Sequence, residues 1–141
     1  MKIAFHGAAR VVTGSKHLIT LSNGKKLLLD CGMFQGMGKD TDAMNRQWGF
    51  RPDEVDYMIL SHAHIDHSGL IPKLVADGYK GSIYCTDATK DLTAVLLEDS
   101  AEIQEDDVKY ENKRRAAAGM PYLKPLYTIE DAQHCFRQFQ S

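Results

Sequence analysis

The sequence predicts an α/β domain built on a mixed sheet. Two observations support this prediction: short apolar runs of strand length open the chain, and strand and helix patterns alternate from residue 57 onward. A chain of 141 residues with 43% hydrophobic and 26% charged residues suits one globular domain. No repeat, low-complexity tract or linker divides it, so we expect the elements to form one unit.

The first thirty residues predict three short antiparallel strands. Residues 2–6 and 17–22 have strand character and flank a loop that contains glycine and serine. The Asn23-Gly24 pair is a strong two-residue hairpin signal, and it separates the second strand from a third at residues 26–30. We therefore expect these strands to pair in chain order.

A long connection and then a strand and helix alternation follow. Residues 31–52 are rich in glycine, with a helical turn expected near residues 40–47, and loops of this length in compact domains are often functional. Capping and chain-breaking residues bound the later elements. We expect a strand at 57–60, then a helix from a Ser68 cap to Asp77, then a strand at 82–85. A long helix capped by Thr86 or Asp87 should reach Ala118, and a last helix should run from a capping box at 128–131 through Phe139.

Charged residues are unevenly distributed, although the net charge is only -2. Residues 1–51 contain eight Lys or Arg against three Asp, an excess that favours a polyanionic substrate. A solvated surface of mixed sign is the alternative, because scattered lysines are common on globular domains. The acidic run at 98–107 precedes four basic residues within 109–115, which predicts an exposed helix face ordered as the helix dipole favours.

The cysteines and the first residues of the chain indicate in which cell compartment we expect the protein. Cys31, Cys85 and Cys135 form no C-x-x-C pair, so we expect buried, reduced thiols rather than disulfides or a cysteine zinc site. The first residues lack the features of a secretory signal, and no window approaches ~18 uninterrupted apolar residues. We therefore expect a cytoplasmic protein with no membrane partner.

Four metal-ligand side chains fall within six residues, directly after the apolar run at 57–60. They are His62, His64, Asp66 and His67. If the apolar run is a buried strand, this segment leaves the sheet at its carboxyl end, where ligand sites of α/β sheets gather. The alternative is a polar loop whose histidines bond only to each other and to water. The density of ligand-type residues favours the metal site.

The spacing of the four residues predicts how they divide between ions. His62 and His64 are two apart, so in an extended segment their imidazoles point the same way and converge on one ion. Asp66 and His67 are adjacent and should diverge, which suits a second ion. Imidazole and carboxylate without thiolate favour zinc, with manganese and iron as alternatives, and two ions together would activate water for attack on a phosphoryl group.

At these residues the sequence resembles the metallo-β-lactamase superfamily, whose H-x-H-x-D-H signature is matched letter for letter. Residues 6–15 and 27–36, with Ser61 and residues 68–72, resemble the RNA-processing β-CASP branch. The resemblance implies that the chain is the amino-terminal half of an αββα sandwich, with a mixed sheet and helices on one face. Residues 1–141 would then be a partial metallo-β-lactamase domain without its carboxyl-terminal half or the β-CASP domain.

The resemblance also implies individual roles. His62 and His64 would bind the first zinc and Asp66 and His67 the second, and Asp66 would also orient or deprotonate the attacking water. Asp30 matches an aspartate at a strand end that supports the metal loop through hydrogen bonds, a role that fixes imidazole orientation and tautomer. An ordinary strand-end carboxylate is the alternative for Asp30.

The resemblance stops before the site is complete. The family needs a third histidine on the first zinc, a bridging aspartate and a last histidine on the second, all from later motifs. We expect His6, His17 and His134 to be core or surface residues rather than these ligands. The 141 residues alone should therefore bind zinc weakly, show little or no turnover, and expose a sheet face through which they self-associate.

Three functions remain open. The first is a zinc-dependent hydrolase that cleaves RNA phosphodiester bonds with metal-activated water. The second is a non-catalytic module for RNA or protein interaction, in which the motif is kept for metal-dependent stability. The third is a hydrolase of thioesters or lactones, because one fold and one metal site host several chemistries.

Overall fold

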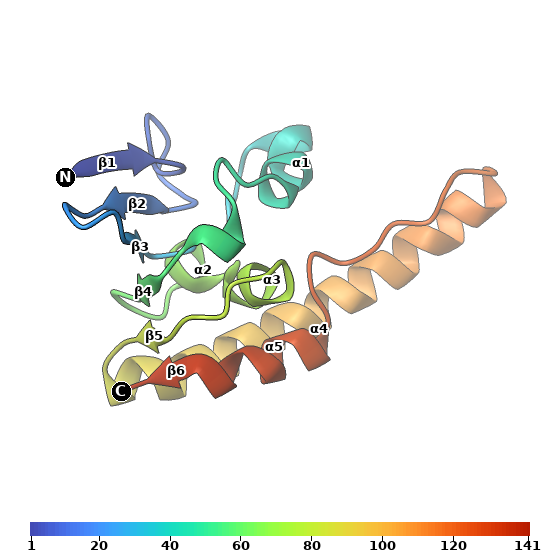
Figure 1. The fold of residues 1–141 in the computed structure, drawn as a ribbon. Coiled ribbons are helices and arrows are strands. Elements are labelled where there is room, and N and C mark those ends of the chain that lie inside the picture. Colours follow the sequence, from blue (N-terminus) through green and yellow to red (C-terminus); the bar gives the residue numbers. More distant parts are fainter.

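Six strands form one mixed sheet in the computed structural model, which describes residues 1–141 (Figure 1). Their order across the sheet follows the chain: β1 (Lys2–Phe5), β2 (His17–Thr20), β3 (Lys26–Leu29), β4 (Tyr57–Ile59), β5 (Ile83–Tyr84) and β6 (Phe139–Gln140). The pairs β1–β2 and β2–β3 are antiparallel, whereas β3–β4, β4–β5 and β5–β6 are parallel. The predicted α/β class and mixed sheet are confirmed.

The turn between β2 and β3 is a hairpin with a three-residue loop. The amide of Leu21 donates to the Lys25 carbonyl at 2.8 Å, and the amide of Gly24 donates to the Leu21 carbonyl at 3.0 Å. Gly24 takes the left-handed conformation, with φ of +84°. This is the usual arrangement of a turn followed by a glycine bulge. The predicted hairpin is confirmed, but the predicted two-residue loop is wrong because Ser22 also belongs to the turn.

Five α-helices accompany the sheet. They are α1 (Thr41–Arg46), α2 (Ile65–Ser68), α3 (Ile71–Ala76), α4 (Asp87–Ala117) and α5 (Ile129–His134). Single 3-10 turns lie at Gly38–Asp40, Pro52–Glu54 and Cys135–Gln138. The helical turn expected near 40–47 is confirmed as α1, and the long helix is confirmed as α4.

The helix that follows the histidine cluster begins earlier than predicted. Ser68 does not cap a helix; it lies at the end of α2, and its Oγ donates to the carbonyls of Ala63 and His64. A separate helix, α3, then begins at Ile71 with Pro72 in its first turn, where a missing amide costs nothing. Asp66 and His67 consequently lie within a helical turn rather than in an extended loop.

The last helix is shorter than predicted, and a sixth strand was not predicted. Thr128 and Asp131 form the predicted capping box, in which each side chain accepts a hydrogen bond from the other residue's amide. The helix ends at His134, and Phe139 enters the sheet instead, where it pairs with Ile83 and is buried. Burial of this ring in the core explains why the chain leaves the helical path.

The core lies between one face of the sheet and the helices. One buried residue from each of β2 to β6 forms a row across this face: Leu18, Leu28, Met58, Ile83 and Phe139. Leu70, Leu74 and Leu97 pack against the row from α4 and from the segment that contains α3. Helices therefore cover one face only, as predicted.

The opposite face of the sheet is open. Its side chains include Ile3, Phe5, Tyr57, Ile59 and Tyr84, which are 39–62% exposed. We refer to these five residues as the open sheet face. The predicted exposed face is confirmed, while self-association through it stays a prediction.

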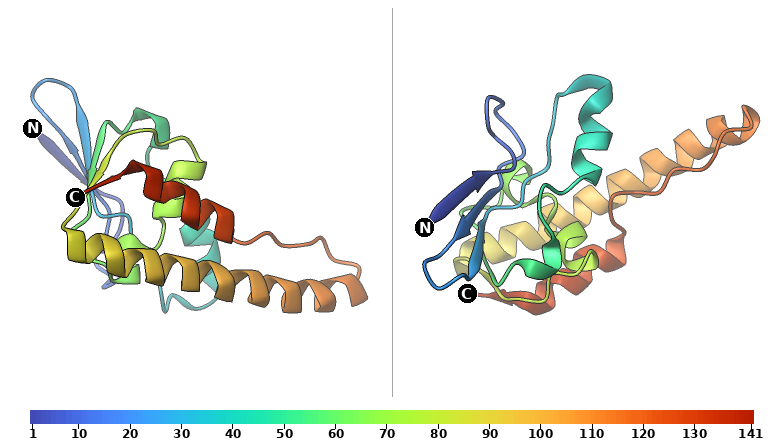
Figure 2. Two further views of the ribbon diagram at one scale, coloured as in Figure 1. Left: turned by 90° about the horizontal axis from the view of Figure 1, so that it is seen from below. Right: turned by 45° about the horizontal axis from the view of Figure 1, so that its top comes forward.

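The carboxyl-terminal half of α4 extends well beyond the body of the molecule, and the chain returns alongside it (Figures 1 and 2). We call residues 108–124 the arm. The Asn112 side chain ties the two limbs together, since its Nδ2 donates to the Leu123 carbonyl and its Oδ1 accepts from the Leu123 amide. Specific hydrogen bonds thus hold the two limbs of the arm against each other.

Candidate metal centre

The four motif side chains lie together at the carboxyl end of β4. His62 and His64 are in the irregular segment between β4 and α2, and their ring centroids are 4.9 Å apart. The rings of His62 and His67 are 4.0 Å apart. Asp66 joins the group through a distance of 3.5 Å between its Oδ2 and His67 Nε2. The structure therefore brings together all four residues that the sequence singled out.

The expected divergence of Asp66 and His67 is wrong. Asp66 Oδ2 lies only 3.5 Å from His67 Nε2, because both residues lie in α2, where successive side chains are about 100° apart and not on opposite sides as in a strand. His67 also faces His62. The four side chains form one cluster rather than two separated pairs.

Asp30 anchors this cluster from below. It is only 4% exposed, and its carboxylate accepts three hydrogen bonds. Oδ1 accepts from the Ser61 amide at 2.7 Å, and Oδ2 accepts from Ser61 Oγ at 2.8 Å and from His67 Nδ1 at 2.8 Å. A buried carboxylate with this many donors holds both ends of the motif segment in place.

These bonds also determine the tautomers of two rings. Nδ1 of His67 must carry a proton, because a carboxylate only accepts. Ser61 gives its one hydroxyl proton to Asp30, so at 2.9 Å its oxygen accepts from His62 Nδ1. In each ring Nδ1 is thus engaged as a donor, so in the neutral imidazole Nε2 is the nitrogen left to bind a metal ion.

The backbone of Asp30 is unusual as well. Its φ is +61°, the left-handed region that non-glycine residues rarely adopt, although aspartate tolerates it better than most. The turn takes the chain out of β3 and directly under the motif segment. Such backbone strain is found where the surrounding structure requires one conformation.

Main-chain hydrogen bonds join the segment after Asp30 to α2. The amides of Cys31 and Met33 donate to the carbonyls of His67 and Ile65, at 2.8 and 3.0 Å. Ser15 bridges the two segments, since its amide donates to the Asp66 carbonyl and its own carbonyl accepts from the Gly32 amide, each at 2.9 Å. The metal loop is thus held by backbone bonds as well as by Asp30.

Gly32 is needed for this close approach. A Cβ atom placed on it would lie 1.7 Å from the Asp66 carbonyl oxygen, far inside contact distance. Only glycine therefore allows the segment after β3 to pack against the backbone of α2.

Lys16 is one of the eight basic residues in the first 51 whose excess favours a polyanionic substrate, but its side chain is not on the surface. It is only 1% exposed. Its Nζ donates to the carbonyls of Gly14 and Gly32, at 3.2 and 2.8 Å, and lies 4.2 Å from the centre of the Phe34 ring. Burial lowers the pKa of this ammonium group. No pattern in the sequence distinguishes a lysine held by backbone carbonyls from an exposed one.

The cysteines are free, and two of them are buried. Burial raises the pKa of Cys31 to about 12, despite the nearby charge of Lys16, and raises that of Cys135 to about 12. Neither supplies a thiolate ligand at neutral pH. The three cysteines form no disulfide, and the prediction of buried thiols is confirmed for Cys31 and Cys135 but not for Cys85, which is only partly buried.

The other histidines lie away from the motif cluster in the way expected of core or surface residues. His6 packs against Phe50 with tilted rings whose centroids are 5.0 Å apart, and burial lowers the pKa of His6. His17 lies in β2, and its buried Nδ1 has no hydrogen-bond partner. His134 ends α5 with its side chain in solvent.

The side chains in the cluster are of the types that bind zinc, but too few of them converge on one point to hold an ion. Three imidazoles and a carboxylate are zinc ligands, and two of the imidazoles have Nδ1 engaged in hydrogen bonds. No three His, Cys, Asp or Glu side chains of the chain are arranged to hold one ion. The 141 residues alone do not present a three-ligand site.

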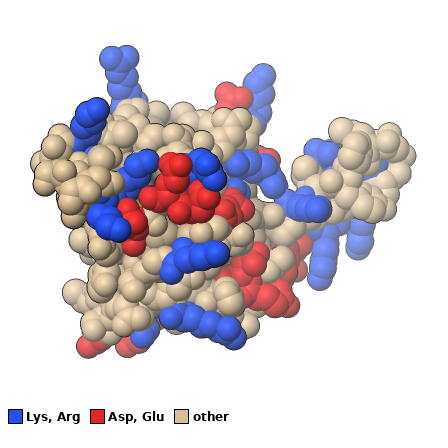
Figure 3. Space-filling model, viewed as in Figure 1, with Lys and Arg blue, Asp and Glu red and all other residues tan.

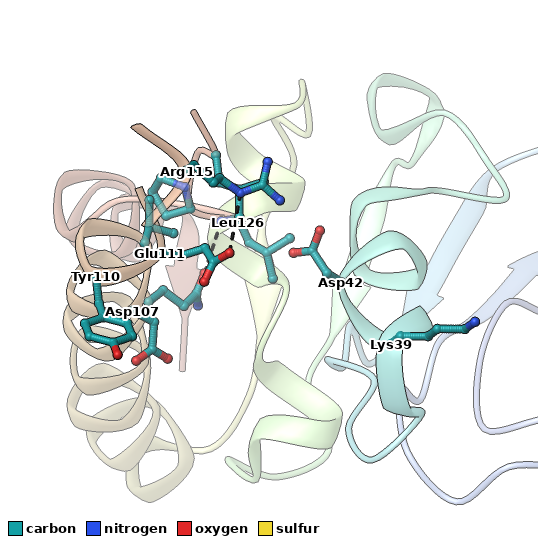
Figure 4. A pocket seen from close by; sticks show the side chains of 11 residues that line it. Lys39, Asp42, Asp107, Tyr110, Glu111, Arg115 and Leu126 are labelled. Atoms are coloured by element: carbon teal, nitrogen blue, oxygen red, sulfur yellow. Dashed lines mark hydrogen bonds and ion pairs between the residues drawn. The ribbon is translucent and has the colours of Figure 1, made fainter. Parts of the chain in front are cut away.

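A cavity of about 620 Å³ lies elsewhere, between α1, the arm and the end of its returning limb (Figure 4). Its lining mixes acids such as Asp42 and Glu111 with Lys39 and Arg115. Arg115 Nε lies 3.6 Å from Glu111 Oε1. None of the motif residues lines this cavity, so it is not the metal centre.

Comparison with protein families matches residues 11–133 to the model of the metallo-β-lactamase superfamily. The chain belongs to this superfamily. The match includes Asp30 and the complete motif, and membership of the superfamily implies metal ions. The predicted superfamily is confirmed.

The curated relatives of this superfamily member include a ribonuclease and a transcription termination factor. It is 44% identical over 126 residues to ribonuclease TTHA0252 of Thermus thermophilus, covering 89% of this chain and 28% of the relative. It is 34% identical to transcription termination factor FttA of Methanocaldococcus jannaschii, a match that covers 77% of this chain and 17% of the relative. It is 37% identical to Integrator complex subunit 11 of Gallus gallus, a match that covers 75% of this chain and 18% of the relative. These matches confirm the resemblance to RNA-processing relatives.

The chain spans less than a third of the length of each of these relatives. None of its helices has the length and apolar composition needed to span a bilayer.

Proposed function

We propose that this chain is the metal-binding part of an enzyme that hydrolyses RNA phosphodiester bonds. The observation that supports this most is the arrangement around Asp30, which accepts from both Ser61 and His67 and so engages Nδ1 of His67 directly and Nδ1 of His62 through Ser61. Carboxylate-to-histidine contacts of this kind orient metal ligands. The RNA-related names of the relatives support the substrate class.

We assign His62 and His64 to a first zinc ion and Asp66 and His67 to a second. When bound, such ions supply Lewis acidity and lower the pKa of water. Asp66 is half-buried beside His67, and we assign its carboxylate the role of orienting the attacking water or accepting its proton. Asp30 holds ring orientation and the tautomers, and it does not contact the substrate.

The domain and location predictions belong to the same proposal. We infer that residues 1–141 form the amino-terminal part of a larger metallo-β-lactamase unit, because the match spans only 28% of ribonuclease TTHA0252 and the resemblance assigns the missing ligands to later motifs. The ligands missing from this chain would then come from later motifs. A cytoplasmic location stays a prediction.

A second function is favoured by one observation, the lack of any three-ligand group. In this alternative the chain is a non-catalytic module that binds RNA or protein, and the motif serves stability. It predicts RNA binding without cleavage in every form of the protein.

A substrate panel tests the proposal against both alternatives. The longest natural polypeptide that contains these residues is offered labelled RNA, a thioester and a lactone, with His64→Ala as the control. We expect cleavage of RNA alone and its loss in the variant. Hydrolysis of the thioester or lactone in preference to RNA, or binding of RNA without any cleavage, would contradict the proposal.

A further inference from the structure

The arm is basic, whereas the part of α4 that leads to it is acidic. Residues 98–107 contain six acids and no base, while the arm contains five bases and the single acid Glu111. Figure 3 shows the blue side chains gathered around the arm and the red ones nearer the body. The positive charge is therefore localised where the fold projects furthest from its core.

A hollow with two lysines and a tyrosine lies on the arm. Its volume is about 360 Å³, and it is lined by Lys109, Asn112, Lys113, Ala116 and Tyr122. Both lysines are exposed and form no ion pair, and the tyrosine is 71% exposed. Cations beside an open aromatic ring can contact a phosphate and a base together.

The backbone that carries Tyr122 is attached to α4 on both sides of the residue. Its neighbour Leu123 exchanges two hydrogen bonds with Asn112, and Arg115 Nη1 donates to the Pro121 carbonyl at 3.1 Å. Tyr122 lies between these two attachments. Stacking of a base on its ring then needs little ordering of the backbone that carries it.

Helix α4 runs from the helix that carries part of the metal motif out to the arm. Helix α2, which contains Asp66 and His67, packs against α4, and Ile65 lines one hollow with Leu96, Ser100 and Ile103 of α4. Lys113 lies about 20 Å further along the axis than Ser100, at an α-helical rise of about 1.5 Å per residue. An RNA strand several nucleotides long could reach from one to the other.

We propose that the arm is a secondary binding surface for the RNA strand. Lys109 and Lys113 contact phosphates, and Tyr122 stacks on one base. This rests on the proposed function for the identity of the polyanion. The tyrosine in the hollow favours RNA over an acidic protein surface, because every base offers a face for stacking.

The test measures RNA binding without cleavage. Fluorescence anisotropy of labelled single-stranded RNA, in the presence of a metal chelator, is compared for the wild type, Lys109→Gln/Lys113→Gln, and Tyr122→Ala. The double variant should reduce the slope of log Kd against log salt by about 1.4, from roughly 0.7 per phosphate contact on single strands. Tyr122→Ala should weaken binding about 5-fold or more, and Tyr122→Phe should restore it.

Lys2→Gln/Lys80→Gln is the matched control, because both lysines are exposed and lie off the arm. It removes the same charge and should have a smaller effect. The proposal is overturned if the arm and control variants weaken RNA binding equally, or if polyglutamate binds as tightly as RNA with the same sensitivity to the arm variants. Intact arm-dependent binding in a protein that never cleaves RNA would overturn the proposed function and leave this proposal standing.

Discussion

Asp30 is the residue on which the geometry of the motif depends. Its carboxylate joins Ser61 to His67, and through Ser61 it determines the tautomer of His62. Its position could be predicted from the resemblance, because an aspartate ends a strand before the long loop. Its left-handed backbone could not be predicted, because only the packing of the loop imposes it.

Replacing Asp30 with asparagine separates charge from shape. Asn tolerates the left-handed region and keeps a similar volume, but it lacks the charged acceptor. We expect Asp30→Asn in the longest natural polypeptide to lower zinc affinity about 10- to 100-fold, measured by chelator competition. Unchanged zinc affinity in a folded Asp30→Asn protein would show that Asp30 is an ordinary strand-end carboxylate.

Cysteine reactivity tests the burial of the site. Burial holds the pKa of Cys31 and of Cys135 at about 12, so both stay protonated at pH 9, where an ordinary exposed thiol is substantially ionised. Burial also raises the pKa of Cys85, but this residue is partly exposed. We expect iodoacetamide at pH 9 to alkylate Cys85 first in the native protein, as read by mass spectrometry. Faster labelling of Cys31 would mean that the loop over the site opens.

At the scale of elements, the decisive contact is between the segment after β3 and α2. Their backbones approach so closely that Gly32 has no room for a side chain. We expect Gly32→Ala to destabilise the fold by about 1–3 kcal/mol, as overpacking does, and to weaken zinc binding. Urea unfolding and chelator competition measure the two effects.

Gly36→Ala is a suitable control for this change. Gly36 has φ of +72°, but a Cβ on it would meet nothing within 4 Å. The substitution should cost about 1–2 kcal/mol through its backbone conformation alone, and zinc binding should be unchanged. Equal loss of zinc binding in both variants would argue against a specific role for the Gly32 contact.

Local signals predicted most of the elements, and tertiary packing decided the remainder. Thr86 and the Thr128 capping box mark helix starts that the structure confirms, because capping is a contact between near neighbours. The start of α2 and the strand β6 were missed. Ser68 has the chemistry of a cap but turns its hydroxyl back to Ala63, and Phe139 is drawn into the sheet by distant core residues.

The sequence likewise predicted the motif residues of the site but not the residues that support them. The four motif residues could be found by type and spacing, and the structure brings them together. Their supports could not be found in the same way. Lys16, Ser15 and Gly32 act through backbone carbonyls and amides, which leave no mark on the sequence beyond an ordinary lysine, serine and glycine.

For the whole molecule, the open sheet face predicts association. Isolated domains rarely leave so many neighbouring large apolar side chains in solvent. We expect the 141-residue chain to associate with rising concentration in light scattering, and Ile59→Lys/Tyr84→Lys to shift it toward monomer. A wild-type chain that is folded and strictly monomeric at high concentration would contradict this.

Zinc-dependent RNA cleavage tests the central claim most directly. The longest natural polypeptide that contains this chain is stripped with a chelator, and cleavage of labelled RNA is followed as zinc is restored, for the wild type, His67→Ala and His134→Ala. His134 is the matched control because it is an exposed histidine outside the motif. We predict that zinc restores cleavage in the wild type and His134→Ala but not in His67→Ala. Cleavage that survives His67→Ala, or that never depends on a metal ion, would contradict the account.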